Sequence, residues 1–329
     1  MKVWDLHCDT LSELRRAEQA GRPLSFARSG LHIDLEKLEA GDYLLQCFAA
    51  FVDLGLGEDP LVTALEEIDV FKRVMAAYPD RIAPVYTSAD IGRNAAAGRI
   101  SAMLTVEEGG CCKGSLGVLR RLYELGVRMM TLTWNYDNDL AASNVKEKAP
   151  FVWPCPPDAE HGLTEKGLAF LAEMERLHMI VDVSHLSDKG FWDIVQHSTR
   201  PFAASHSNCR ALAPHCRNLT DEMIRAMAGR GCIAGLNYCT AFLDDQPDPA
   251  DCRSTAALIA QHAAHFKQVG GADMIALGSD FDGIGGPLEL DSCAKMPLLA
   301  DALRKAGFTE DEVEGIFWRN ARRFFEENL

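Results

Sequence analysis

Histidine and carboxylate side chains stand at the ends of short apolar runs throughout this chain of 329 residues. They occur in five groups: His7-Cys8-Asp9, Glu107-Glu108-Gly109-Gly110, Ser184-His185, Ser205-His206 and Asp280-Phe281-Asp282. Imidazole and carboxylate groups without thiolates suit zinc, with manganese or iron as alternatives. A catalytic zinc takes three protein ligands and a water, so these groups exceed what one ion needs. The pattern predicts a two-metal hydrolytic centre.

The spacing of these residues suggests how two ions would be shared. Residues two apart in a strand point to the same side, so His7 and Asp9 are predicted to bind one ion together. His185 and His206 are predicted to bind the other. A carboxylate such as Glu108 can bridge the two ions, which would then lie about 3.5–4 Å apart around a shared hydroxide.

Other polar and sulfur residues receive supporting roles. Asp182 has the opposite parity to His185, so it is expected to face the helices or to orient a neighbouring group. Asp5 shares the parity of His7 and is expected to support the metal site from below. The eleven cysteines are mostly single and lie in apolar segments, which predicts reduced, buried thiols. The adjacent pair Cys111-Cys112 is interpreted as structural.

The elements that must position these groups are eight apolar runs separated by helical patterns. Thr309 and Glu312 form a capping box before the last predicted helix. The eight predicted strands span Val3–Asp9, Tyr43–Val52, Ile100–Glu108, Arg128–Trp134, Met179–His185, Pro201–His206, Cys232–Tyr238 and Met274–Asp280.

Apolar strands that alternate with helices are typical of a parallel sheet buried on both faces. Eight of them predict an α/β fold, a (β/α)8 TIM-type barrel, as one domain over residues 1–329. An open doubly wound sheet is the alternative, but Asp9-Thr10-Leu11 follows the first strand instead of a glycine-rich turn. In a barrel all five polar groups open onto the face that carries active sites. The long segments 20–42 and 136–161 are predicted to cover this mouth.

The composition argues against two classes of partner. The chain has 33 Lys+Arg against 48 Asp+Glu, a net charge of −15, which disfavours nucleic acid and anionic membranes. The N-terminus reaches Asp5 and His7 before an apolar segment forms, so we expect no secretory signal. The longest apolar stretch spans about ten residues, whereas a membrane span needs roughly twenty. We therefore expect a cytoplasmic protein.

The order and spacing of the motifs resemble those of the membrane (renal) dipeptidases and their bacterial relatives, zinc-dependent dipeptidases of the amidohydrolase-like barrel class. The resemblance covers nearly the whole chain. It is carried by Asp5-Leu6-His7-Cys8-Asp9-Thr10, His32-Ile33-Asp34-Leu35-Glu36-Lys37-Leu38, Glu108-Gly109-Gly110, Leu125-Gly126-Val127-Arg128, Val183-Ser184-His185, Ser205-His206-Ser207, Cys216-Arg217-Asn218, Gly278-Ser279-Asp280-Phe281-Asp282-Gly283 and Asn320-Ala321-Arg322-Arg323-Phe324.

The resemblance implies two Zn²⁺ per chain. Its ligand set is the one inferred above from residue types and spacing: His7, Asp9 and the bridging Glu108 on one ion, and Glu108, His185 and His206 on the other. It further implies that Arg217 binds the carboxylate of the substrate. Asp280 would handle protons during attack by the bridging hydroxide and would hold the substrate amine. The resemblance also implies a homodimer.

One position departs from the family pattern. Where well-known members carry a histidine that polarises the scissile carbonyl, this chain has Thr133-Trp134-Asn135. Trp134 has an indole N–H donor but no imidazole, so we expect it to affect substrate scope and rate more than reaction class.

The function expected from these observations is a binuclear-zinc dipeptidase that cleaves free dipeptides by attack of a metal-bridging hydroxide. The resemblance implies that L-Xaa-D-Xaa dipeptides are included. An alternative in the same class is an amidohydrolase acting on N-acyl amino acids, lactams or lactones. A third reading is a binding protein whose barrel keeps a metal site without catalysis.

Overall fold

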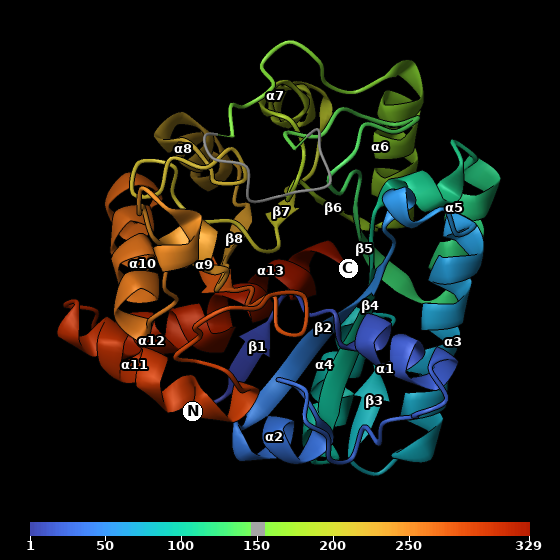
Figure 1. Cartoon of the computed structure of the whole chain (residues 1–329), viewed down its shortest axis with the longest axis horizontal. Helices are drawn as coiled ribbons and strands as arrows, with labels where there is room; N and C mark the ends of the chain where they lie inside the picture. The colour runs from blue at the N-terminus through green and yellow to red at the C-terminus, as the bar shows by residue number, and fades with distance from the viewer. Residues whose placement is uncertain (146–154) are drawn as a thin grey trace.

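Eight parallel strands close into a barrel in the computed structural model, which describes residues 1–145 and 155–329. Around the barrel they follow the order β2-β1-β9-β8-β7-β6-β5-β4, and pairing of β2 with β4 completes the ring. Helices surround the strands (Figure 1), so the predicted (β/α)8 fold is confirmed. The barrel strands are β1 (Val3–Asp5), β2 (Tyr43–Phe51), β4 (Ile100–Glu107), β5 (Val127–Thr131), β6 (Ile180–Asp182), β7 (Ala203–Ala204), β8 (Ile233–Leu236) and β9 (Ile275–Leu277).

A ninth strand, β3 (Ile82–Pro84), is added outside this ring. It pairs with the first residues of β4, from Ile100 to Ala102, whereas β5 pairs with β4 only from Leu104 onward. The strand pattern did not indicate β3, because it has three residues and ends in a proline that has no N–H for a sheet ladder.

The helices fill the connections between strands and cover the outside of the barrel. Their bounds are α1 (Thr10–Gln19), α2 (Leu35–Ala40), α3 (Pro60–Ala77), α4 (Ser88–Ala96), α5 (Leu116–Leu125), α6 (Glu165–Leu177), α7 (Asp188–His197), α8 (Asp221–Gly229), α9 (Thr240–Leu243), α10 (Ala256–Gly270), α11 (Met296–Lys305), α12 (Glu310–Glu314) and α13 (Asn320–Asn328). In the part of the chain that the structure describes, no helix has the length and apolar character needed to span a bilayer.

Local signals set most of the helix starts. Ser187 and Thr220 accept hydrogen bonds from backbone N–H groups at the starts of α7 and α8, and the capping box of Thr309 and Glu312 opens α12. The cap of α10 is Thr255. The last predicted helix is α12 and α13 joined by a π-helical turn over Gly315–Arg319.

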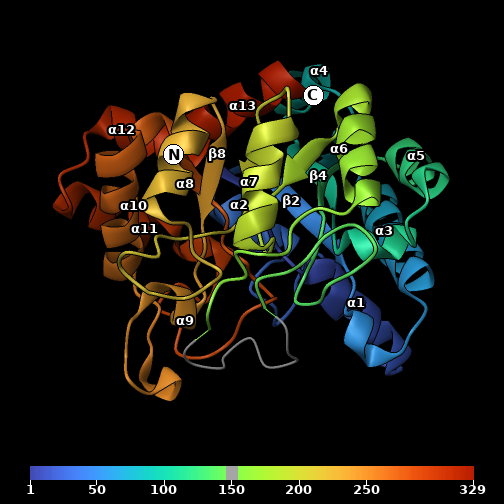
Figure 2. The same ribbon diagram turned by 90° about the horizontal axis from the view of Figure 1, so that it is seen from above.

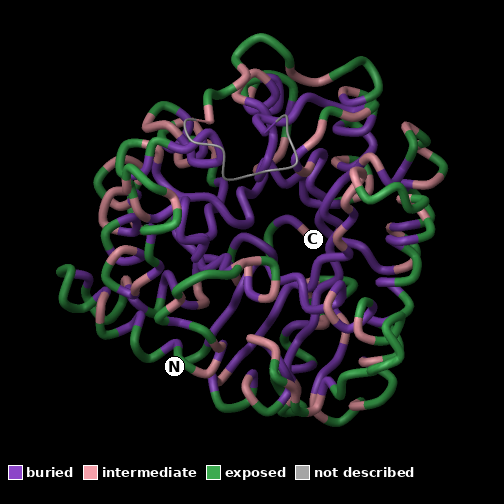
Figure 3. The backbone as a smooth tube through the Cα atoms, viewed as in Figure 1, coloured by how far each residue is buried: buried purple, intermediate pink, exposed green. Residues whose placement is uncertain are grey.

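The two ends of the barrel differ. Figure 2 shows α13 at one end and long connecting loops with α9 at the other. Phe325 of α13 is buried, and its ring stacks on Trp4 of β1 with ring centroids 5.4 Å apart. The strands are buried along almost their whole length (Figure 3). The barrel is therefore closed at its amino-terminal end and carries its loops at the other.

The long segments predicted at the mouth are partly confirmed. His32, from the segment 20–42, accepts a hydrogen bond at Nδ1 from the backbone N–H of Asp282 (3.0 Å). In the segment 136–161, Ser143 donates to the carbonyl of His185 (3.1 Å). Pro150 and Pro154 of this segment lie outside the described residues.

The cysteines depart from expectation at one place. Cys155 and Cys216 form a disulfide, whereas the sequence predicted reduced, buried thiols. The two residues are 61 apart in the chain and lie in loops, so no strand or helix pattern brings them together. The remaining nine cysteines are buried free thiols, as predicted.

Candidate active site

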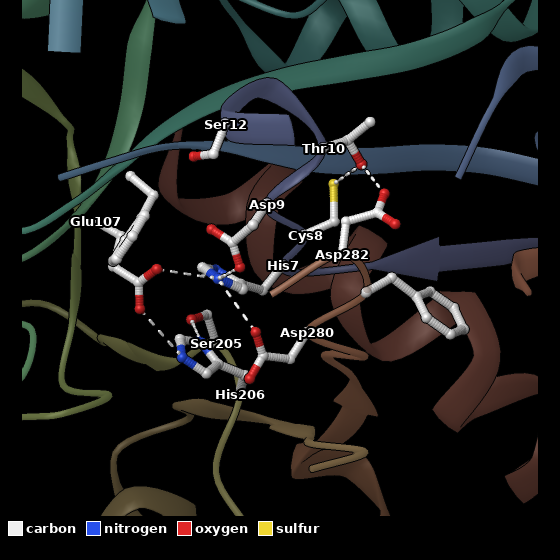
Figure 4. A network of polar contacts seen from close by, with 12 residues as sticks. His7, Cys8, Asp9, Thr10, Ser12, Glu107, Ser205, His206, Asp280 and Asp282 are labelled. Carbon is white, nitrogen blue, oxygen red and sulfur yellow. Dashed lines mark hydrogen bonds and ion pairs between the residues drawn. The ribbon is translucent and has the colours of Figure 1, made fainter. Parts of the chain in front are cut away.

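His7 lies at the centre of a group of carboxylates at the mouth of the barrel (Figure 4). Its Nε2 is 3.3 Å from Glu107 Oε2, 3.4 Å from Asp9 Oδ2 and 3.9 Å from Asp280 Oδ1. These residues follow or end β1, β4 and β9, whose carboxyl ends meet in a barrel. The predicted partnership of His7 with Asp9 is present.

A second group forms on the other oxygen of Glu107. Its Oε1 lies 2.9 Å from His185 Nε2 and 3.4 Å from His206 Nε2. The two Nε2 atoms are 3.0 Å apart. Glu107 therefore faces His7 with one carboxylate oxygen and both other histidines with the second, which is the arrangement of a bridging ligand.

Glu107, not Glu108, occupies this position, so the expectation for Glu108 is corrected. Met103 faces the apolar interior of the barrel, and residues two apart in a strand share a side. Glu107 therefore points inward and Glu108 does not. Strand parity separates Glu107 from Glu108 in the sequence, and the interior position of Met103 in the structure decides which of the two points inward.

Glu108 serves the neighbouring loop. Its backbone has φ 91°, in the left-handed region that few residues other than glycine adopt. Its carboxylate accepts hydrogen bonds from the backbone N–H of Gly110 (2.7 Å), the backbone N–H of Trp134 (2.7 Å) and the side-chain amide of Asn138. This carboxylate is thus engaged in holding the start of the loop after β4 and the loop after β5.

Hydrogen bonds to the outer ring nitrogens orient two of the histidines. His185 Nδ1 lies 2.9 Å from Asn135 Oδ1, and His206 Nδ1 lies 2.6 Å from Ser205 Oγ. Ser205 Oγ donates to Asp182, so it accepts from His206. Both Nδ1 atoms then carry the proton, and both Nε2 atoms present lone pairs toward Glu107.

Asp182 and Asp5 hold the backbone beneath the site. Asp182 Oδ1 accepts from the backbone N–H of Ser184 (3.0 Å) and of Ser205 (2.9 Å). Asp5 Oδ1 accepts from the backbone N–H of His7 (3.2 Å) and of Ser279 (2.9 Å). Of the two roles weighed for Asp182, orienting a neighbouring group is the one observed.

This donor set fits divalent metal ions. Two lone-pair nitrogens 3.0 Å apart beside a carboxylate oxygen repel one another unless a cation lies among them. Within the described residues, the buried atoms His7 Nε2 and Asp9 Oδ1 have no hydrogen-bond partner. Neutral imidazoles whose other nitrogen donates to an oxygen are the usual form of metal-binding histidine.

The electrostatics of the two groups differ. Burial, reinforced by the charge of Arg217, lowers the pKa of His185 to about 4, and burial with the charge of His7 holds the pKa of His206 well below its usual value. Burial also acts to lower the pKa of His7, but the carboxylates of Glu107 and Asp9 raise it well above its ordinary value. The site therefore attracts positive charge to the position of His7 Nε2.

Asp280 and Arg217 flank the metal-binding groups. Asp280 has φ 64° and accepts a hydrogen bond at Oδ2 from the side-chain amide of Asn237 (2.9 Å). Arg217 is buried, and among the described residues its guanidinium makes only long hydrogen bonds, to the carbonyl of His206 (3.3 Å) and to Ser207 Oγ (3.5 Å). Its Nε has no partner among the described residues. A buried guanidinium with spare donors suits an anionic ligand group.

The mouth contains a cavity of about 270 Å³ above these residues. That is just below the roughly 300–1,000 Å³ typical of sites for drug-sized ligands, so it suits a smaller molecule. Trp134, predicted at the substrate site, lines the cavity. The other lining residues are Asp9, Ser12, Arg16, Phe51, Asp53, Glu107, Asn135, His185, Cys239, Phe242, Asp280, Asp282, Gly283 and Ile284.

Comparison with known proteins connects this site to one family. The model of the membrane dipeptidase family, peptidase family M19, matches residues 1–328. A protein of Schizosaccharomyces pombe described as an uncharacterized dipeptidase is 31% identical over 310 residues, which cover 90% of this chain and 72% of the relative. A dipeptidase of Claviceps purpurea is 30% identical over 307 residues, which cover 90% of this chain and 69% of the relative.

Solved structures show the same likeness. A dipeptidase described as an M19 metallopeptidase superposes with a TM-score of 0.89 at 28% identity, covering 100% of this chain and 98% of its own. A metallopeptidase of Rhodobacter sphaeroides, bound to a phosphinate mimic of the dipeptide L-Ala-D-Ala, superposes with a TM-score of 0.88 at 26% identity, covering 100% of this chain and 99% of its own.

Proposed function

Since the chain belongs to the membrane dipeptidase family, peptidase family M19, and is a metal-dependent dipeptidase, we propose that it hydrolyses free dipeptides with two zinc ions bound at the barrel mouth. His7, Asp9 and Glu107 would hold one ion, and Glu107, His185 and His206 the other. The observation that carries this proposal is the division of Glu107 between two separate groups of ligand atoms. Zinc bound there would polarise the scissile carbonyl and activate a shared water.

Asp280 is the residue proposed to move protons. Asn237 fixes its Oδ2, which leaves Oδ1 directed toward His7 and Asp9. From this position Oδ1 can take a proton from the attacking water and deliver it to the nitrogen of the leaving amine. The same carboxylate can hold the free amine of the substrate.

Arg217 is proposed to bind the carboxylate of the dipeptide. The guanidinium lies over the ring of Phe242, with 5.4 Å from Cζ to the ring centroid, and Phe242 lines the cavity. A carboxylate one residue beyond the scissile bond can accept from the spare donors of Arg217. A longer peptide has no charge at that point, so it would leave a buried cation unpaired.

Substrates with a D-residue at the second position are included in the proposal. The Rhodobacter sphaeroides metallopeptidase structure holds a mimic of L-Ala-D-Ala, which supports this extension to a chain of the same fold.

A panel of L,L- and L,D-dipeptides tests the function. The zinc-loaded protein is expected to hydrolyse free dipeptides and to fail on their N-acetylated and C-amidated forms, and Asp280→Asn is expected to lose the activity. Hydrolysis of N-acyl amino acids, lactams or lactones in place of dipeptides would contradict the proposal.

A further inference from the structure

Two aromatic rings form one side of the active-site cavity. Phe51 is the last residue of β2 and pairs in register with Glu107 of β4. Trp134 follows β5 and meets Phe51 edge to face, with ring centroids 4.9 Å apart. Both side chains are half-buried and line the cavity, so they present apolar surface directly beside the proposed bridging carboxylate.

Hydrogen bonds hold the backbone of both Phe51 and Trp134. The N–H of Trp134 donates to Glu108 (2.7 Å), and its carbonyl accepts from Ser143 Oγ (2.5 Å). The N–H of Phe51 donates to the buried carboxylate of Glu67 (2.7 Å). Because the backbone is held and the two rings pack against each other, the aromatic pair loses little entropy when a ligand packs on it.

A third ring supports the pair from behind. The ring of Tyr136 lies 5.8 Å from the ring of Trp134, and burial together with the neighbouring carboxylate of Asp53 raises the pKa of the Tyr136 hydroxyl. A Cβ added at Gly55 would lie 2.3 Å from this hydroxyl, so Gly55 makes room for it. The aromatic surface is a packed part of the fold.

The barrel order places Phe51, at one side of this surface, opposite Arg217, whereas Trp134 follows β5, two strands from β7. Arg217 contacts the carbonyl of His206 and Ser207, immediately after β7. Counting strands from β7 through β8, β9 and β1 leads to β2, and counting through β6, β5 and β4 leads to β2 as well. Phe51 at the end of β2 therefore lies diametrically across the mouth, with the histidines and Glu107 between.

We propose that Phe51 and Trp134 form the subsite for the side chain of the N-terminal residue of the dipeptide, and that the enzyme selects large apolar residues there. The inference rests on the proposed function, because it assumes that Arg217 takes the carboxylate. A substrate anchored at Arg217, with its peptide bond over the metal ligands, must extend its N-terminal residue toward β2. Apolar side chains on that residue then lose water contact against the two rings.

Two series of dipeptides test the assignment. In the X-Ala series, X is Gly, Ala, Leu or Phe; in the Ala-X series the same residues occupy the second position. The wild-type kcat/KM is expected to rise at least tenfold from Gly-Ala to Phe-Ala, because in an apolar pocket a single methylene already changes the rate by roughly tenfold or more. Trp134→Ala is expected to reduce the Phe-Ala to Gly-Ala ratio by about tenfold while the ratio for the Ala-X series stays constant.

A second variant and a matched control keep the result interpretable. Phe51→Leu is expected to lower the same ratio about threefold and guards against misfolding of Trp134→Ala. Trp192→Ala, at a tryptophan of α7 that is 39% exposed and does not line the cavity, is expected to leave both ratios unchanged.

The outcomes separate the two proposals. If wild-type protein cleaves no dipeptide, the proposed function fails. If it cleaves dipeptides but both variants keep the wild-type X-Ala ratio, or change the Ala-X ratio instead, the aromatic subsite is refuted while the function stands.

Discussion

The two ends of the barrel interior are buried alike but built from opposite chemistry. At the amino-terminal end, Trp4, Met103 and Ile180 point inward and Phe324 and Phe325 of α13 close the opening. At the other end His7, Glu107 and their partners are nearly as inaccessible. Burial of apolar surface stabilises a fold, whereas burial of ionisable groups opposes folding unless they are paired or bind metal. The amino-terminal end of the barrel thus stabilises the fold, and the other end carries the candidate catalytic and metal-binding groups.

At the polar end, the largest expected effect on activity and zinc content comes from Glu107→Gln, in contrast to the same change at the adjacent Glu108. Glu107→Gln removes the proposed bridging carboxylate, so activity is expected to fall on the order of 10³-fold or more, with fewer than two zinc ions retained. Glu108→Gln is expected to retain two ions, because among the described residues the carboxylate of Glu108 accepts hydrogen bonds from the loops after β4 and β5. Zinc per chain, measured by atomic emission, checks both. Loss of zinc from Glu108→Gln alone would reverse the assignment.

Phe325→Ala probes the apolar end. Phe325 is fully buried against Trp4, so its truncation is expected to cost about 3–5 kcal/mol of stability while folded protein keeps its zinc and turnover. Thermal unfolding of the zinc-loaded protein measures this. Leu298→Ala, at a residue that is 43% exposed, should change stability by less than about 0.5 kcal/mol. Loss of zinc by folded Phe325→Ala protein would contradict the independence of the two ends.

A methyl group at Gly283 tests how closely the polar end is packed. The added Cβ would lie 2.0 Å from Asp9 Oδ2 and 2.7 Å from Asp280 Oδ1, so both carboxylates must move. Gly283→Ala is expected to weaken zinc affinity about 10–100-fold, measured by chelator competition. At Gly285 the same atom meets nothing within 4 Å, and Gly285→Ala should bind zinc as wild type does. Equal affinities in the two variants would count against Asp9 as a ligand.

A pH dependence of stability is expected at Glu67, whose carboxylate accepts hydrogen bonds from the Ser12 hydroxyl and from the backbone N–H of Phe51. Burial raises its pKa to about 8. Between about pH 4.5 and pH 8 the unfolded chain loses this proton and the native protein keeps it, so stability falls as pH rises.

Glu67→Gln removes that penalty. Its unfolding temperature is expected to match that of the wild type below pH 4.5 and to exceed it increasingly up to pH 8, where the free energies of unfolding differ by on the order of a few kcal/mol. Thermal melts across this pH range provide the measurement. A constant offset between variant and wild type would show that Glu67 is ionised in the native state.

Sequence patterns predicted the apolar framework well because its signals are local. Eight apolar runs and their spacing suffice for the barrel, and strand-end position alone brings His7, His185 and His206 together. The choice between Glu107 and Glu108 needed strand parity counted from Met103. Arg217 and the Cys155–Cys216 disulfide lie in loops, where no period fixes the direction of a side chain. The high pKa of Glu67 depends on contacts with distant segments.

The adjacent residues Glu107 and Glu108 have different contacts. One carboxylate faces the histidines, and the next holds the backbone of Trp134. A shift of this strand end would displace both carboxylates, so we expect changes to this backbone to alter metal loading and substrate preference together. Engineering of this enzyme toward new dipeptides is therefore expected to succeed more readily through ring substitutions at Phe51 and Trp134 than through redesign of the loop backbone.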